Sequence, residues 1–261
     1  MIYDPFLRAY ILFWLAVIGS VTGSLLDCMA FRWMSEKGLP KGRSRCEACG
    51  HILGPGDLIP IFSYLFHGGK CRYCKSKIPA DCILAELAGA FIFAGMGLRF
   101  GWSGELFMWL VLGGGLLFLS LADARWRIIP DEALLVLLLG RLAGLFLLGE
   151  PFRETCIRMV LGAGIIPGAL LAIVLLMDRM TGRETMGGGD IKLMFVLGLY
   201  LDWMQMLLLL LLACALGLVA AALKGRRSRK AGIPFGPFLS AACLLTVWYG
   251  EPVLAWYRGF F

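Results

Sequence analysis

Two aspartates in this sequence occur where paired carboxylates could do chemistry. Asp190 follows three glycines in the stretch Met186–Lys192, and Asp123 ends an apolar stretch earlier in the chain. An acid beside hydrocarbon costs about 2.5–3.5 kcal/mol, so a functional role is the first hypothesis for it. Two carboxylates in a low-dielectric site tend to share one proton, which leaves one base to activate water and one acid to protonate a carbonyl. The pair therefore predicts aspartyl-protease chemistry, provided that both acids lie at one membrane depth.

The spacing of the two acids also fits other interpretations. They could be unrelated residues at the membrane surface, each paired with its own cation, Arg125 or Lys192. A transporter or ion pathway could use them as a proton or cation site, because intramembrane acids are common there. Many transporters carry inverted internal repeats, and none is evident in this sequence.

The composition predicts the membrane environment of these acids. Of the 261 residues, 59% are hydrophobic and only 16% are charged, and the mean hydropathy is +0.79. These values are typical of a polytopic membrane protein and not of a soluble core. The net charge of +7 does not indicate a nucleic-acid partner, because the basic residues gather in loops between apolar stretches. We therefore expect an all-α membrane protein that binds no nucleic acid.

Eight apolar stretches set the predicted topology. They lie near 6–31, 82–100, 105–122, 133–148, 157–177, 186–201, 203–223 and 235–249. The sixth is marginal, because its helix would cover about 24 Å of a hydrocarbon core about 30 Å thick. Most of the 25 Lys and Arg residues fall in the loops at 32–77, 125–127, 179–192 and 224–230. The positive-inside rule makes these loops cytoplasmic, so we expect eight transmembrane helices, both termini outside, and both aspartates at the cytoplasmic face.

Four cysteines in the first polar loop form a metal-type pattern. They are Cys46, Cys49, Cys71 and Cys74, two CxxC pairs with 21 residues between them. This spacing suits tetrahedral coordination of zinc by thiolates, which a reducing cytosol keeps available. A metal would supply much of the folding energy of so small a loop. A redox-active or unliganded set of cysteines is the alternative, and we expect His51 and His67 to lie outside the ligand set.

Three motifs resemble those of one enzyme family. The stretch Glu184–Leu193 resembles the E-x-M-G-x-G-D-x-K-L signature of type IV prepilin peptidases, the bifunctional leader peptidase/N-methyltransferases. Asp123 followed by Ile129-Pro130-Asp131 resembles the family's other aspartate motif, and Ile233–Phe238 resembles its C-terminal signature. The resemblance covers nearly the whole chain and makes Asp123 and Asp190 the catalytic pair.

The resemblance also gives roles to the neighbours of Asp190. Gly187 and Gly189 would support the site and the substrate, together with Lys192. Glycine can adopt a positive φ and lets an extended substrate backbone approach closely, which fits this role. A flexible loop is the other interpretation of these glycines.

The resemblance implies two activities. Family members remove the short basic leader of type IV prepilins or pseudopilins, and they methylate the new N-terminus with S-adenosylmethionine. The cytoplasmic loop is associated with methyl transfer in the family, and Ile59-Pro60, Ser63-Tyr64-Leu65 and Glu86 match its pattern. Glu86 is the candidate for holding the cationic amine, and pairing with a basic loop residue is its alternative role. The sequence departs from the pattern at Asp27, Gly68 and Asp81-Cys82-Ile83.

These expectations divide the chain into three parts. They are a first transmembrane helix (1–31), a cytoplasmic zinc-binding loop associated with methyl transfer (32–81) and a transmembrane aspartyl peptidase core (82–261). The resemblance places the protein in the bacterial inner membrane, with prepilin or pseudopilin substrates and membrane lipid as partners. A zinc-ribbon scaffold without catalysis is a further alternative, and it predicts that both aspartates can be replaced freely. The sequence makes no prediction of the oligomeric state.

Overall fold

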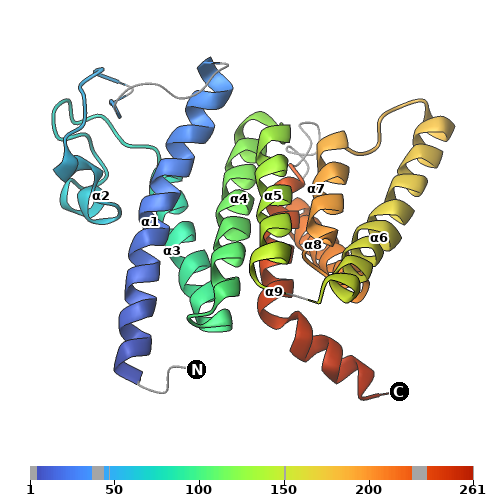
Figure 1. Ribbon diagram of the computed structural model, residues 1–261. Helices are drawn as coiled ribbons and strands as arrows, with labels where there is room; N and C mark the ends of the chain where they lie inside the picture. Colours follow the sequence, from blue (N-terminus) through green and yellow to red (C-terminus); the bar gives the residue numbers. More distant parts are fainter. Residues whose placement is uncertain (1–4, 37–43, 47, 150, 225–233, 261) are drawn as a thin grey trace. The chain divides into compact units, whose positions relative to one another are not determined.

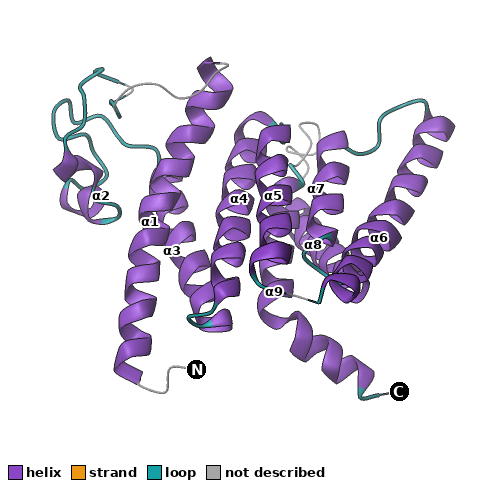
Figure 2. Ribbon diagram, in the orientation of Figure 1, coloured by secondary structure: helices purple, strands orange, loops and turns teal. Residues whose placement is uncertain are grey.

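The computed structural model describes residues 5–36, 44–46, 48–149, 151–224 and 234–260. Within these ranges the chain is helical and contains no strand, as Figure 2 shows. The elements are α1 (Pro5–Glu36), the 3-10 helix η1 (Pro55–Leu58), α2 (Phe62–Phe66), α3 (Ala80–Phe100), α4 (Gly104–Trp126), α5 (Asp131–Leu147), α6 (Phe152–Thr181), α7 (Gly188–Gly198), α8 (Trp203–Lys224) and α9 (Gly236–Arg258) (Figure 1). Most of the basic loop 224–230, which is predicted to be cytoplasmic, lies outside the described ranges.

Each of the eight predicted membrane stretches contains a helix. Six of these helices in the described chain, α1, α3, α4, α6, α8 and α9, are long and apolar enough to cross a membrane. This confirms the prediction of a multi-pass all-α protein. α5 has 17 residues and α7 only 11. At 1.5 Å per residue α7 reaches about 16 Å, so the expected length of about 24 Å for the sixth stretch is wrong.

The shortness of α7 has a local cause at each end. The chain before Gly188 is a loop, so the glycines open the helix instead of preceding a longer one. Asp202 lies directly before the next helix, α8. Its Oδ1 atom accepts the Gln205 backbone N–H at 2.9 Å, and the Gln205 Oε1 atom accepts the Asp202 backbone N–H at 3.2 Å. This reciprocal cap fixes the start of α8. A full membrane crossing by α5 and α7 stays a prediction.

The chain divides into two compact units, residues 1–121 and 122–261, with the boundary near the end of α4. In the first unit, glycines bring α1 and α3 together. A Cβ atom on Gly23 would lie 2.2 Å from the carbonyl oxygen of Ala85, and one on Gly19 would lie 2.3 Å from that of Gly89. Gly19 and Gly23 form a G-x-x-x-G pattern, which lets two membrane helices approach backbone to backbone. The functional division at 31 and 81 stays a prediction.

In the second unit, α7 lies between neighbouring helices and contacts α5, α6 and α8, while α8 packs on α9. α6 crosses α7 closely, since a Cβ atom on Gly198 would lie 2.5 Å from the backbone of α6. The side chains of Leu193, Met194 and Leu197 are fully buried. The helix that begins beside Asp190 is therefore held on three sides.

Candidate active site

Asp123 lies near the end of α4 and is held at the start of α9. The residue is 6% exposed, and its Oδ2 atom accepts a hydrogen bond of 2.9 Å from the backbone N–H of Gly236. Gly236 is the first residue of α9, and a helix N-terminus favours a negative charge. A Cβ atom on Gly236 would lie 2.8 Å from the same Oδ2 atom. The glycine of the C-terminal motif therefore makes room for this carboxylate.

Asp190 lies in the first turn of α7. Its backbone N–H donates to the carbonyl of Gly187, the N-cap residue, at 3.1 Å. Its Oδ1 atom is buried and has no hydrogen-bond partner among the described residues. Asp190 lies within electrostatic range of Asp123. The structure thus brings together the acids that the sequence paired, and their catalytic role stays a prediction.

Two contacts fasten α7 to α5. Near the start of both helices, Lys192 Nζ donates to both carboxylate oxygens of Asp131, at 2.8 and 2.9 Å. At the other end of α7, Arg141 Nε donates to the carbonyl of Leu199 at 3.0 Å. Because early residues pair with early residues and late with late, the two helices run parallel. Lys192 therefore joins the start of α7 to α5, and its support of the site stays a prediction. The alternative in which Lys192 pairs with Asp190 is not found among the described residues.

Arg141 is a residue to which the sequence analysis gave no role. It is 7% exposed within the apolar α5. Leu199 is the C-cap of α7, where carbonyl groups lack helical partners and the helix dipole favours a cation. A charge buried in an apolar helix is costly, so it calls for such a partner. The sequence did hold a signal for this contact. The stretch 133–148 contains a single arginine, and the apolar stretch 186–201 is too short to cross the membrane.

Arg127 is a cation whose charge acts on the Asp123 carboxyl group. Its φ of 57° lies in the left-handed region, and its backbone N–H donates to the Asp123 carbonyl at 2.9 Å, which ends α4. The Arg125 guanidinium lies instead over the ring of Trp126, 5.8 Å from its centroid.

The glycines before Asp190 act through close packing. None of them has a positive φ: Gly187 has φ −62°, and the next two begin α7, so the left-handed conformation open to glycine is not used here. A Cβ atom on Gly189 would lie 2.9 Å from the Cβ of Ile129, whereas one on Gly188 would meet nothing within 4 Å. Gly189 lets α7 approach the chain that follows Asp123, because any side chain there would push the two apart.

This difference gives a matched test. We expect Gly189→Ala to lower the rate of substrate cleavage by about 100-fold, since a displacement of about 1 Å at a catalytic group has that effect. Gly188→Ala adds the same methyl group to the same helix and should keep nearly the wild-type rate. Rates are measured with the purified variants in lipid. Equal rates for the two variants would show that packing against Ile129 does not position Asp190.

The four predicted cysteines form one cluster. The Sγ atoms of Cys46, Cys49, Cys71 and Cys74 all lie within 4.8 Å of one another. The Cys46 and Cys74 sulfurs are 3.8 Å apart, which equals the edge of a ZnS₄ tetrahedron, about 3.8 Å for Zn–S bonds of about 2.3 Å. Neither histidine is in the cluster, as expected: His51 stacks on Tyr73 with ring centroids 3.7 Å apart. The donor set therefore fits zinc.

The two CxxC segments fold alike. In the first, the Cys46 N–H donates to the carbonyl of His51 at 2.9 Å, and the Gly50 N–H donates to the carbonyl of Cys46 at 2.8 Å. In the second, Cys71 and Lys75 make the corresponding bonds at 2.8 and 3.0 Å. Gly50 and Lys75 both have positive φ, 72° and 60°. Each turn thus directs its two thiols to one point.

The cluster favours a bound cation. The backbone N–H of Cys49 donates toward the Cys46 sulfur and lowers the pKa of Cys46 to about 6. The Ser76 hydroxyl likewise lowers the pKa of Cys74. Although the His51 backbone favours the Cys49 thiolate, desolvation and the neighbouring cysteines raise the pKa of Cys49 to about 11. A divalent cation would stabilise all four thiolates together.

We expect the purified protein to carry about one zinc ion per chain, because four thiolates complete a structural shell. Cys46→Ser and Cys71→Ser should each remove the metal, since each takes a ligand from a different turn. Cys82→Ser, outside the cluster, should keep it. Elemental analysis of freshly purified protein makes the measurement. Wild-type protein without zinc would contradict the assignment.

Glu86 lies in the first unit, in the second turn of α3, and is 9% exposed. Its Oε1 atom accepts the Ser24 hydroxyl at 2.8 Å, and its Oε2 atom accepts the Ile61 backbone N–H at 2.7 Å. Within the described ranges no cation pairs with it, so the alternative pairing with a basic loop residue is not found there. Glu86 thus ties the loop to both α1 and α3.

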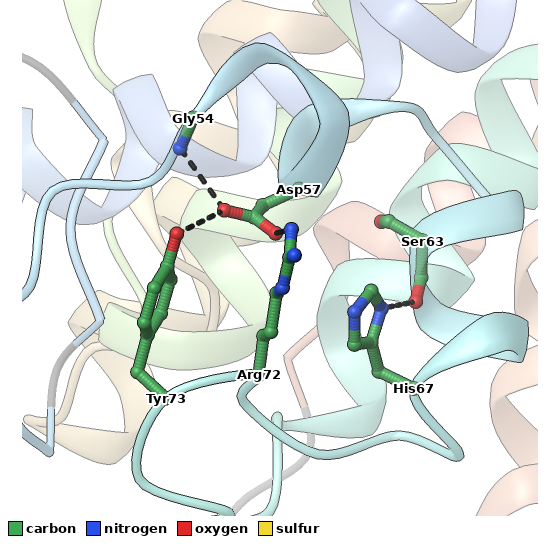
Figure 3. A network of polar contacts seen from close by, with 6 residues as sticks. All are labelled: Gly54, Asp57, Ser63, His67, Arg72 and Tyr73. Atoms are coloured by element: carbon green, nitrogen blue, oxygen red, sulfur yellow. Dashed lines mark hydrogen bonds and ion pairs between the residues drawn. The ribbon is translucent and has the colours of Figure 1, made fainter.

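A cavity of about 400 Å³ opens beside the cysteine cluster. Its charged lining residues are Arg45, Asp57, Lys70, Arg72 and Lys77. Figure 3 shows Asp57 accepting hydrogen bonds from the Gly54 N–H and the Tyr73 hydroxyl, at 3.1 and 3.3 Å, with Arg72 3.9 Å away. The cavity also reaches Cys82 at the start of α3. Cys82 and Glu86 are four residues apart on this helix, so they share one face.

A multi-pass helical membrane protein with a close carboxylate pair and a four-cysteine loop is the class that the fold and the site define. Comparison with known families makes this specific. Residues 17–100 match the bacterial peptidase A24 N-terminal domain, and residues 110–222 match the type IV leader peptidase family. The chain therefore belongs to the type IV leader peptidase family, which confirms the family predicted from the three motifs.

Relatives of this chain carry the name prepilin leader peptidase/N-methyltransferase. The one from Pseudomonas aeruginosa is 35% identical over 83% of this chain and 75% of its own length. The one from Bacillus subtilis is 32% identical over 93% of this chain and 96% of its own length. The one from Pseudomonas putida is 32% identical over 95% of this chain and 93% of its own length. No solved structure matches the chain significantly.

Proposed function

We propose that this protein is a membrane endopeptidase that removes the leader of type IV prepilins or pseudopilins at the cytoplasmic face and then methylates the new N-terminus. The observation that carries the proposal is the pairing of Asp123 with Asp190, two acids from separate motifs. The names of the relatives support the substrate class and both activities. The basic loops flanking both acids support the cytoplasmic side.

In the proposed hydrolysis, one aspartate is ionised and the other carries a proton. The ionised carboxylate takes a proton from water as the water oxygen bonds to the scissile carbonyl carbon, and the other acid protonates the carbonyl oxygen. The C–N bond then breaks as the first aspartate gives its proton to the leaving amine. The second recovers a proton from the tetrahedral intermediate, so the pair returns to its starting state.

The surroundings of the two acids support one division of these roles. Asp123 accepts the Gly236 N–H at the start of α9, and a donor of this kind favours the charged form of a carboxylate. Asp190 has a buried Oδ1 atom without a donor among the described residues, so a proton there leaves no lone charge buried. We assign Asp123 as the base and Asp190 as the acid.

Asp123→Asn and Asp190→Asn should each reduce leader removal to background, because an amide can neither accept the proton from water nor return one. Both variants should remain folded and zinc-loaded in the membrane. Glu132→Gln changes an exposed acid close to Asp123 in sequence and serves as the control with normal cleavage. The assay follows the size of a prepilin incubated with each purified variant. Full cleavage by either asparagine variant would rule out the pair.

The methylation step requires S-adenosylmethionine, which would supply an electrophilic methyl group when bound. The cavity beside the cysteines is within the range of ligand sites, about 300–1,000 Å³. Asp57 offers an acceptor for hydroxyl or amino groups, and the cations Arg45 and Lys70 offer partners for a carboxylate. Glu86 lies on the face of α3 that reaches this cavity. A carboxylate has about four acceptor positions, so Glu86 can hold an amine beside its two existing bonds.

Methylation should depend on Glu86 while cleavage does not. We expect Glu86→Gln to give cleaved pilin with methylation reduced by about 100-fold or more, because an amide cannot take the proton of the attacking amine. Ser24→Ala removes one bond to Glu86 but keeps the carboxylate, so it should still methylate. The readout is the mass of the pilin N-terminus with S-adenosylmethionine present. Normal methylation by Glu86→Gln would leave Glu86 with only the task of anchoring the loop.

A further inference from the structure

The short helix α2 exposes an apolar face that the proposed function does not use. Phe62, Leu65 and Phe66 are 61%, 65% and 84% exposed. Leu58 and Ile59, just before α2, are exposed as well. The helix has an inner side too, because Tyr64 packs against Gly69, where an added Cβ atom would lie 2.9 Å from its ring. Large apolar side chains gathered on one face of a small loop indicate an interaction surface.

A hydrogen bond fixes the position of this face along α3. The N–H of Ile61, the residue before α2, donates to Glu86 Oε2 at 2.7 Å. Glu86 lies six residues into α3, about 9 Å along the helix from its first residue. α3 is long and apolar enough to cross the membrane, and its 21 residues cover about 31 Å, the thickness of the hydrocarbon core. The start of α2 is therefore held by α3 within the part of that helix that would cross hydrocarbon. Figure 1 shows α2 on one side of α1.

Polar residues follow the apolar face directly. His67 is half-buried and its Nδ1 atom donates to the Ser63 carbonyl at 2.8 Å, whereas Lys70 is exposed. An apolar face with a cation such as Lys70 at its edge is the pattern of segments that lie in the boundary between headgroups and acyl chains. A lysine there keeps its charge among lipid phosphates while its stem remains among apolar groups.

We propose that Phe62, Leu65 and Phe66 insert into the bilayer and contact phospholipid. The occupant of this face is lipid, because the bond between Ile61 and Glu86 places it beside a membrane span. The insertion fixes the height of the loop, and so of its cavity, at the membrane surface. That height suits methylation of a pilin amine that emerges from the bilayer. Only this consequence rests on the proposed function; the contact with lipid does not.

The test places the photoreactive residue benzoylphenylalanine at position 66 of the full-length protein in nanodiscs of phosphatidylethanolamine and phosphatidylglycerol. Irradiation followed by intact-mass analysis shows which molecule the residue touched. We expect a phospholipid adduct with a yield close to that from Phe91, which is 68% exposed in α3 and serves as the lipid control. Position 51, exposed in the cysteine turn, serves as the control in water and should give none.

Position 65 provides a second probe, so a folding defect at one position does not decide the result. Retained zinc shows that the loop of each probe variant is folded. Absence of a lipid adduct at both positions, with a normal adduct at position 91, would overturn the proposal. So would an adduct formed only with another copy of the protein. The assay contains no prepilin, so its outcome is independent of whether the protein cleaves one.

Discussion

The placement of two carboxyl groups in one site, with Asp123 buried and Asp190 half-buried, is the constraint on which the active-site unit depends. Neither acid can be placed there without help, because a buried charge needs a partner and two like charges repel. Asp123 receives the first N–H of α9, and Gly236 leaves room for it. Asp190 is placed by a helix only 11 residues long. Such a helix gains little stability from its own hydrogen bonds, so neighbours must hold it.

α5 provides that support at both ends of α7. The pair between Lys192 and Asp131 is exposed, and such a pair contributes about 0–1 kcal/mol, so it aligns the helices more than it stabilises them. The bond from Arg141 is different, since the guanidinium is buried and meets a carbonyl that the helix leaves open. Without this bond, the Arg141 guanidinium and the Leu199 carbonyl would lose their hydrogen bond to each other in an apolar setting. The buried contact is therefore the stronger constraint on α7.

The sequence could predict those features that a local pattern encodes. Hydropathy and the loop charges gave the all-α multi-pass class, and the CxxC spacing gave the cysteine cluster. The pairing of Asp123 with Asp190 followed from a shared depth. Arg141 could not be matched to Leu199, nor Gly236 to Asp123, because a chain pattern does not say which distant helix end approaches a residue. For the same reason the sequence could not show that Gly189 lets Ile129 come close.

We propose that this acid pair cleaves a leader peptide. The most direct measurement is the intact mass of a type IV prepilin after incubation with the purified, zinc-loaded wild-type protein in lipid, with S-adenosylmethionine added. We expect a pilin shortened by its leader, with the cut after a glycine, and heavier by one methyl group at the new N-terminus. A shortened pilin without the methyl group would confine the protein to hydrolysis. A prepilin that stays intact with folded, zinc-loaded protein would contradict the account.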